Sequence, residues 1–143
     1  MKKIFTIVIA IAIVNLVVSQ NISGTVVTRT ISSTYLQNNG GEDPNRRISI
    51  YLPPAYDQSK QRYPVIYYLH GFMGNDSIYP GMKNILDMGI AKNKIRPYIL
   101  VIADNNTLFS GSFYSNSTLT GSWTDFEAKE LVAYMDKNFR TIA

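Results

Sequence analysis

Residues 64–71 read Pro64-Val65-Ile66-Tyr67-Tyr68-Leu69-His70-Gly71, an apolar run that ends in a histidine and a glycine. Such a continuous run is typical of a strand that is covered on both faces. A second apolar run, residues 98–103, follows Pro97. Between the two runs, Pro80 precedes apolar residues at helical spacing, namely Met82, Ile85, Leu86 and Ile90. Strand, helix and strand in this order predict a βαβ unit, and therefore an α/β fold with a parallel sheet.

Two further strands are predicted before this unit. Residues 25–31 are rich in β-branched side chains, which favour extended structure. Residues 46–52 alternate, with Ile48, Ile50 and Leu52 on one face and Arg47, Ser49 and Tyr51 on the other. This alternation predicts a strand that is buried on one face only, and Pro53-Pro54 ends it.

A long loop and a helix follow the βαβ unit. Residues 104–123 are mostly Asn, Ser, Thr, Gly and aromatic residues, and a loop of this length inside a compact domain is usually functional. Thr124 and Glu127 have the spacing of a capping box, which predicts a helix over residues 124–139. Its expected apolar face consists of Ala128, Leu131, Val132, Met135 and Phe139. Residues 141–143 are expected to begin another strand.

The N-terminal segment has the features of a signal peptide. Lys2 and Lys3 precede an almost continuous apolar run from Ile4 to Val14, and Val17 and Ser19 satisfy the small-residue rule for cleavage. The expected organisation is a signal peptide over residues 1–19 and a domain over residues 20–143. An uncleaved N-terminal anchor is the alternative. The sequence therefore predicts a secreted or periplasmic protein without a stable membrane anchor.

Composition excludes several kinds of site. The chain has 14 basic and 10 acidic residues and no clustered basic stretch, so no nucleic-acid partner is expected. It has no cysteine, which rules out a thiol nucleophile and cysteine metal ligands. No cluster of histidines and carboxylates suggests a metal, and no cofactor is expected.

The turn after residues 64–69 is the best-placed candidate site. It contains His70, Gly71, Phe72 and Gly74, and ligands of open α/β sheets bind beyond the carboxyl ends of the strands. The Phe72 N–H is expected to form half of an oxyanion hole, which stabilises the charge that develops in acyl transfer. An ordinary tight turn is the alternative. His70, the only histidine, is expected to hold the loop by hydrogen bonds instead of acting as the general base.

No nucleophile is evident. A serine nucleophile on a strand-to-helix elbow needs the pattern Gly-x-Ser-x-Gly, whereas Ser112 and Ser122 directly follow Gly111 and Gly121. The carboxylates Asp87, Asp104, Asp125 and Asp136 have no second histidine to pair with.

Several motifs in this order resemble the putative esterase family, which includes esterase D, feruloyl esterases, enterochelin esterases and mycolyltransferases. They are residues 47–56, residues 63–71, the segment Tyr114-Ser115-Asn116-Ser117, and residues 121–141 with Trp123, Glu130 and Asp136. The resemblance implies the α/β-hydrolase fold, here the N-terminal half of its sheet, and a Ser-His-Asp/Glu mechanism. It also implies that residues 70–72 supply the first oxyanion donor. The chain ends before the expected Gly-x-Ser-x-Gly, so nucleophile, acid and catalytic histidine are all expected after Ala143.

Three functions remain open at this point. The first is a fragment of a secreted serine carboxylic ester hydrolase, inactive alone, whose full form acts on acyl esters such as acetyl or feruloyl esters of plant polysaccharide. The second is an acyltransferase of the same fold. The third is a short secreted binding protein without catalytic activity, and the exposed strand edge that a half-sheet leaves argues against it.

Overall fold

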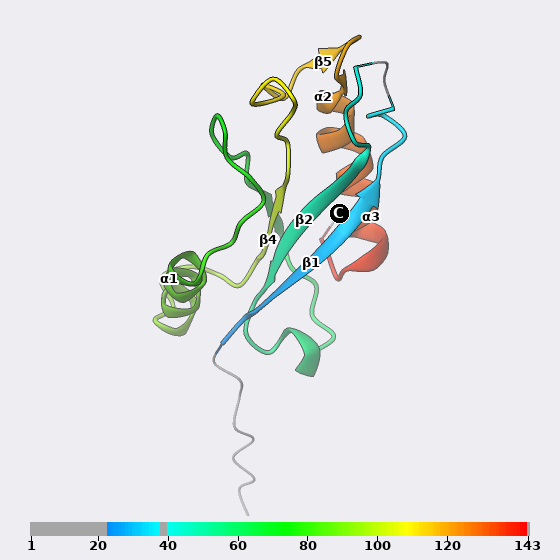
Figure 1. The fold of residues 1–143 in the computed structure, drawn as a ribbon. Helices are drawn as coiled ribbons and strands as arrows, with labels where there is room; N and C mark the ends of the chain where they lie inside the picture. The colour runs from blue at the N-terminus through cyan, green and yellow to red at the C-terminus, as the bar shows by residue number, and fades with distance from the viewer. Residues whose placement is uncertain (1–22, 38–39, 143) are drawn as a thin grey trace, which may run out of the picture.

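The computed structural model describes residues 23–37 and 40–142 (Figure 1). The predicted signal peptide, residues 1–19, lies outside the described residues. The strands are β1 (Thr25–Ser32), β2 (Asn45–Leu52), β3 (Val65–Tyr67), β4 (Ile99–Ala103), β5 (Asn116–Ser117) and β6 (Gly121–Ser122). The helical segments are the 3-10 turn η1 (Tyr56–Gln58), α1 (Pro80–Ala91), α2 (Trp123–Asp125), the π-helical segment η2 (Phe126–Leu131) and α3 (Val132–Asn138).

The main sheet has the strand order β1-β2-β4-β3. β2 is antiparallel to both β1 and β4, whereas β3 and β4 are parallel, with Ile66 opposite Leu100. Helix α1 connects the two parallel strands, which confirms the predicted βαβ unit. The strands predicted over residues 25–31, 46–52 and 98–103 are confirmed as well.

Helical segments cover both faces of the sheet (Figure 1). On one face, Ile48 and Ile50 of β2 pack with Trp123, Phe126 and other buried residues of the α2–η2–α3 segment. On the other face, Tyr51 of β2 packs with Leu86 of α1 and with residues of β4. The prediction that residues 46–52 are buried on one face only was therefore wrong. On the second face, Tyr51 is buried against α1, and Ser49 is buried beside Asp76.

The prediction that residues 65–69 form a strand covered on both faces was also wrong for the described chain. β3 is only three residues long and forms an edge of the sheet, and the Ile66 side chain is 46% exposed. A single parallel bridge joins Tyr63, just before β3, to Thr141. The Ile142 N–H donates to the Tyr63 carbonyl at 2.9 Å, so the chain after α3 pairs with the residue that precedes β3. Residue 143 of the strand expected over residues 141–143 lies outside the described residues.

The helix predicted over residues 124–139 begins at Trp123 and contains a π-helical turn, in which the buried residues Phe126 and Leu131 are five positions apart. The predicted capping box is absent. The Thr124 hydroxyl donates to the Tyr114 carbonyl, and the Asn116 side-chain oxygen accepts the Thr124 N–H instead. The predicted apolar face is right for Leu131 and Met135, which are buried, but not for Ala128, which is exposed.

Candidate functional site

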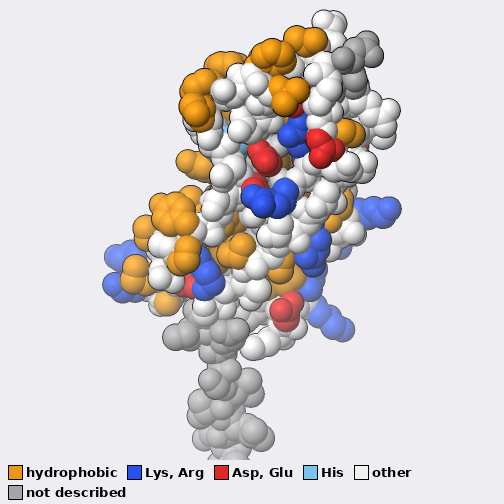
Figure 2. Space-filling view, in the orientation of Figure 1, with side chains coloured by type: hydrophobic (Ala, Val, Ile, Leu, Met, Phe, Trp, Pro, Cys, Tyr) orange, Lys and Arg blue, Asp and Glu red, His pale blue; other side chains and the backbone are white. Residues whose placement is uncertain are grey.

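The loops that follow β3 and β4 meet at the carboxyl ends of these two parallel strands. They enclose a pocket of about 300 Å³, lined by His70, Gly71, Phe72, Asn105, Gly111, Ser112, Phe113 and Tyr114. Exposed hydrophobic side chains gather at this end of the molecule (Figure 2), among them Met73, Leu108 and Phe109. The carboxyl edge of an α/β sheet is where ligands bind in this class of fold.

His70 is engaged through both nitrogens of its ring. Its Nε2 accepts the Asn105 N–H at 3.1 Å, so this nitrogen carries no proton. Its Nδ1 therefore carries the proton and donates to the Gly71 carbonyl at 2.9 Å. The Tyr114 hydroxyl donates to the His70 carbonyl at 2.7 Å. These contacts join the turn after β3 to the loop after β4 and leave neither ring nitrogen available as a general base.

The turn at residues 71–74 is tight. The Gly74 N–H donates to the Gly71 carbonyl at 2.9 Å, and the Met73 N–H donates to the Ser110 carbonyl at 3.3 Å. A β-carbon at Gly74 would lie 2.8 Å from the Gly71 carbonyl oxygen and from His70 Nδ1, whereas a β-carbon at Gly71 would meet no atom within 4 Å. Glycine is therefore required by packing at position 74 only.

We expect Gly74→Ala to lower the free energy of unfolding by roughly 1–3 kcal/mol, because the new methyl group forces the turn apart. We expect Gly71→Ala, the matched control, to change it by less than about 0.5 kcal/mol, since its methyl group enters open space. Urea unfolding of both variants measures the difference. Equal losses in the two variants would contradict this description of the turn.

Phe72 directly precedes Met73 and Gly74, whose amides both donate hydrogen bonds. Within residues 23–37 and 40–142, the Phe72 N–H donates to no hydrogen bond. The Phe72 side chain is 66% exposed and packs against the Phe113 ring, with the ring centroids 5.9 Å apart. Phe72 thus lines the pocket and has a backbone donor without an acceptor in the described chain.

Asn105 and Glu127 lie beside His70. Asn105 is only 1% exposed, and its side-chain nitrogen donates to the Ala103 carbonyl and to Glu127 Oε1, at 3.2 and 2.5 Å. Burial raises the pKa of the Glu127 carboxyl, and the hydrogen bond from Asn105 opposes this effect. Burial, together with Glu127 and Tyr68, raises the pKa of Tyr114 to about 12.

The raised pKa of Glu127 predicts a specific pH dependence of stability. The folded state favours the protonated carboxyl more than the unfolded state does, so stability is fully present below the unfolded pKa and falls as pH rises through the folded pKa. Glu127→Gln removes this titration. We expect the melting temperature of Glu127→Gln, relative to that of the unmodified chain, to increase from pH 4 to pH 8. A difference that is constant with pH would contradict the prediction.

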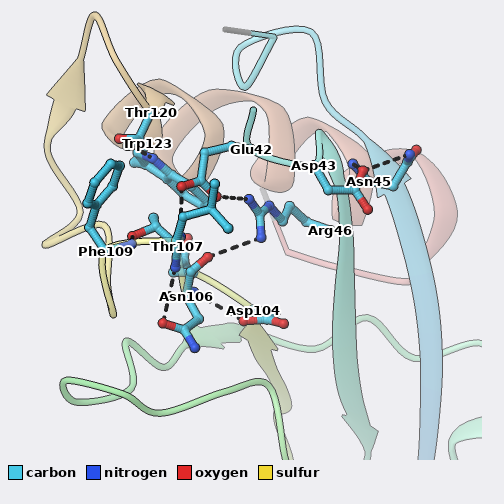
Figure 3. Close-up of polar contacts among 12 residues, drawn as sticks. Glu42, Asp43, Asn45, Arg46, Asp104, Asn106, Thr107, Phe109, Thr120 and Trp123 are labelled. Atoms are coloured by element: carbon cyan, nitrogen blue, oxygen red, sulfur yellow. Dashed lines mark hydrogen bonds and ion pairs between the residues drawn. The ribbon is translucent and has the colours of Figure 1, made fainter. Parts of the chain in front are cut away.

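A buried ion pair fixes the far side of the loop after β4 (Figure 3). Arg46 and Glu42 are 3.1 Å apart, with side chains only 9% and 3% exposed. Arg46 also donates to the Asn106 carbonyl, and Glu42 accepts the Leu108 N–H at 2.8 Å. The Arg46 guanidinium lies 4.7 Å from the centre of the Trp123 ring. The pair therefore connects β2, the loop after β4 and the helical segment.

The chain beyond the turn is anchored through Asp76. This carboxylate is buried and accepts hydrogen bonds from Arg47 of β2 and from the Ser49 hydroxyl, the latter at 2.8 Å. The turn at residues 70–74 is thus held on both sides, by His70 before it and by Asp76 after it.

Of the four residues of the predicted turn, His70, Gly71 and Phe72 line the pocket, and Gly74 closes the turn through its hydrogen bond to Gly71. The sequence analysis missed Glu42, Asn105 and Glu127. Asn105 is the second residue after β4, which is parallel to the strand before His70, and this position is the signal that could have identified it.

Two features were not found in the described part of the chain, a metal-binding cluster and a membrane-spanning helix. Residues 23–37 and 40–142 contain no group of three or more histidine, aspartate or glutamate side chains that could hold a metal ion. No helix within the same ranges has the length and hydropathy needed to cross a membrane.

Comparison with known proteins identifies the family. The sequence profile described as Putative esterase matches residues 42–143. An endo-1,4-beta-xylanase/feruloyl esterase of Xylanibacter ruminicola is 34% identical over 105 residues, which cover 66% of this chain and 14% of that protein. The chain therefore spans a small part of this relative.

Solved structures agree on the fold. A ferulic acid esterase superposes with a TM-score of 0.72 at 23% identity, over 85% of this chain and 45% of that one. A ferulic acid esterase from Anaeromyces mucronatus, solved in complex with ferulic acid, superposes with a TM-score of 0.61 at 17% identity, over 84% and 45% of the two chains. This chain thus corresponds to less than half of each structure. It belongs to the Putative esterase family, and its fold is part of the α/β-hydrolase fold.

Proposed function

We propose that this chain is the N-terminal portion of a secreted serine carboxylic ester hydrolase and that it supplies one half of the oxyanion hole. The observation that carries the proposal is the unused Phe72 N–H at the pocket beyond β3 and β4. Membership of an esterase family supports the reaction class. Residues 1–19 support export, because they have the composition of a signal peptide.

The proposed role of Phe72 is electrostatic. When a nucleophile attacks an ester carbonyl, the oxygen becomes negatively charged, and a fixed N–H donor stabilises this charge more than it stabilises the neutral ester. Removing one such donor typically costs about 10²–10³ in kcat. The second donor, the serine nucleophile, the acid and the catalytic histidine would lie on chain that follows Ala143.

The hydrogen bonds of Tyr63, just before β3, support the placement of the nucleophile after Ala143. The Tyr63 N–H donates to the Arg140 carbonyl at 2.8 Å, and the Ile142 N–H returns to the Tyr63 carbonyl. This is the hydrogen-bond pattern that begins a parallel strand beside β3. A strand that continued along this edge would end next to the turn at residues 70–74, where a nucleophile could reach an ester held by Phe72.

We propose acyl esters of carbohydrate as the substrate class, with an aromatic acyl group such as feruloyl as the first candidate. The aromatic rings of Phe72, Phe113 and Tyr114 line the pocket and provide flat apolar surfaces. The feruloyl esterase names of the relatives support the same choice.

Hydrolysis and ligand binding can be tested separately. We expect the chain to hydrolyse no 4-nitrophenyl acetate above the uncatalysed rate, because the proposal places the serine nucleophile after Ala143. Turnover that persists through repurification would contradict the placement of the nucleophile after Ala143.

Binding at Phe72 can be followed by NMR of the chain labelled with ¹⁵N-phenylalanine. The chain has six phenylalanines, and Phe72→Pro identifies the Phe72 signal by removing it. We expect ferulate, whose carboxylate mimics the charged oxygen, to shift this signal. Coniferyl alcohol, which has the same ring without the carboxylate, is expected to leave it in place. Ferulate binding that moves other signals but not that of Phe72 would overturn the proposed oxyanion role.

A further inference from the structure

A continuous series of hydrogen bonds runs from the helical segment to the peptide group that contains the Phe72 N–H. Glu127 Oε1 accepts from the Asn105 side chain at 2.5 Å, and the Asn105 N–H donates to His70 Nε2 at 3.1 Å. The His70 Nδ1–H then donates to the Gly71 carbonyl at 2.9 Å. Hydrogen bonds thus connect η2 and the loop after β4, through His70, to the Gly71 carbonyl.

The geometry of the peptide group transmits this arrangement to Phe72. The Gly71 carbonyl and the Phe72 N–H belong to the same planar trans peptide, so they point in opposite directions. The Gly71 carbonyl is held by two donors, the His70 ring and the Gly74 N–H. Holding the carbonyl toward these donors turns the Phe72 N–H away from them, and Phe72 is one of the residues that line the pocket.

The protonation pattern of His70 is essential to this arrangement. The hydrogen bond made by one imidazole nitrogen determines which nitrogen carries the proton. If the proton were on Nε2, it would oppose the Asn105 N–H, and Nδ1 would face the Gly71 carbonyl without a proton. The turn would then lose one of its two holding bonds.

The side chain of Asn105 keeps its backbone N–H in place. It is buried and bonded to both the Ala103 carbonyl and Glu127, and the Asn105 carbonyl accepts the Ser112 N–H at 3.1 Å. Glu127 comes from a different element, the π-helical segment η2, and so fixes the loop after β4 relative to the helix.

We propose that Glu127 and Asn105 are positioning residues that hold His70 with its proton on Nδ1 and thereby aim the Phe72 N–H at the pocket. That the Phe72 N–H stabilises an oxyanion rests on the proposed function. That His70 carries its proton on Nδ1 does not. Glu127 and Asn105 act through His70 and the Gly71 carbonyl, not by contact with a substrate.

The single histidine of the chain makes the test direct. In the chain labelled with ¹⁵N-histidine, the imidazole nitrogen signals report which nitrogen carries the proton. We expect the Nδ1–H form in the unmodified chain. Glu127→Ala and Asn105→Ala should reduce this form to a minority, whereas Glu127→Gln, which can still accept from Asn105, should restore it.

Glu130 provides the matched control. It lies on the same helical segment, and its carboxylate accepts hydrogen bonds from Ser33 and Thr34 instead of from the pocket loop. Glu130→Ala should lower stability and leave His70 in the Nδ1–H form. A purely structural role for Glu127 predicts the same behaviour in both alanine variants.

Several results would overturn the proposal. They are a proton on Nε2 in the unmodified chain, an unchanged Nδ1–H form in a folded Glu127→Ala chain, or loss of this form in Glu130→Ala. If Glu127→Ala does not fold, Asn105→Ser, which shortens the side chain but keeps it polar, provides the same comparison. Because no ester is involved, these outcomes are independent of the ferulate titration that tests the proposed function.

Discussion

Replacing Glu42 with alanine is expected to lower the free energy of unfolding by about 3–5 kcal/mol, the usual cost of removing one partner of a buried ion pair. Arg46 would keep its charge in an environment where its side chain is only 9% exposed. The Leu108 N–H would lose its acceptor at the same time. Urea unfolding followed by the fluorescence of Trp123, the only tryptophan, measures the loss close to the substitution.

The exposed ion pair between Lys129 and Asp125 provides the control. These side chains are 2.6 Å apart, closer than Arg46 and Glu42, but Lys129 is 64% exposed. We expect Lys129→Ala to change the free energy of unfolding by less than about 1 kcal/mol, because water replaces the lost partner. A loss in Glu42→Ala that is no larger than in Lys129→Ala would show that the buried pair does not hold the loop.

Replacing Trp123 with alanine is expected to cost about 3–5 kcal/mol, the range for a fully buried aromatic side chain. Trp123 has no exposed surface, and its ring packs edge-on against Phe126 with the centroids 6.2 Å apart. The indole N–H donates to the Thr120 hydroxyl at 3.2 Å. The substitution leaves a cavity between the sheet and the helical segment and removes the ring beneath Arg46.

Phe113→Ala is the matched control for this substitution, because Phe113 is also aromatic but largely exposed. We expect Phe113→Ala to leave stability nearly unchanged, and circular dichroism can follow the thermal unfolding of both variants. Comparable melting temperatures for the two would contradict the placement of Trp123 in the core.

The βαβ unit could be predicted from the sequence because its evidence is local. The apolar run of residues 98–103 and the helical spacing of Met82, Leu86 and Ile90 each indicate one element. Their order then restricts the topology, since connections between parallel strands are right-handed and short.

Burial could not be predicted in the same way, because it depends on neighbours that the local pattern does not identify. Tyr51 alternates with Ile50 and Leu52 as an exposed residue would, yet α1 covers it and its hydroxyl donates to Asp87 at 2.7 Å. The error for Ile66 is the reverse. The sequence pattern predicts that Ile66 is buried, but it lies in the edge strand β3 and is exposed.

Competition between partners explains the missed capping box. Thr124 and Glu127 have the required spacing, but Asn116 reaches the helix N-terminus, and Asn105 occupies the Glu127 carboxylate. Asn105 belongs to the loop after β4 and Asn116 to β5, so both partners lie more than one helical turn away in sequence from the residues they contact. The contact with Asn105 also makes Glu127 part of the candidate site. Interpreting Glu127 as a capping residue therefore hid its place in the site.

The coding sequence beyond codon 143 tests most directly whether this chain is the first part of a serine ester hydrolase. The account predicts that the reading frame continues into a strand that pairs with β3, followed by Gly-x-Ser-x-Gly and, further on, by an acidic residue and a histidine. A stop codon directly after Ala143 in an intact gene would contradict it, because Phe72 would then have no nucleophile with which to act.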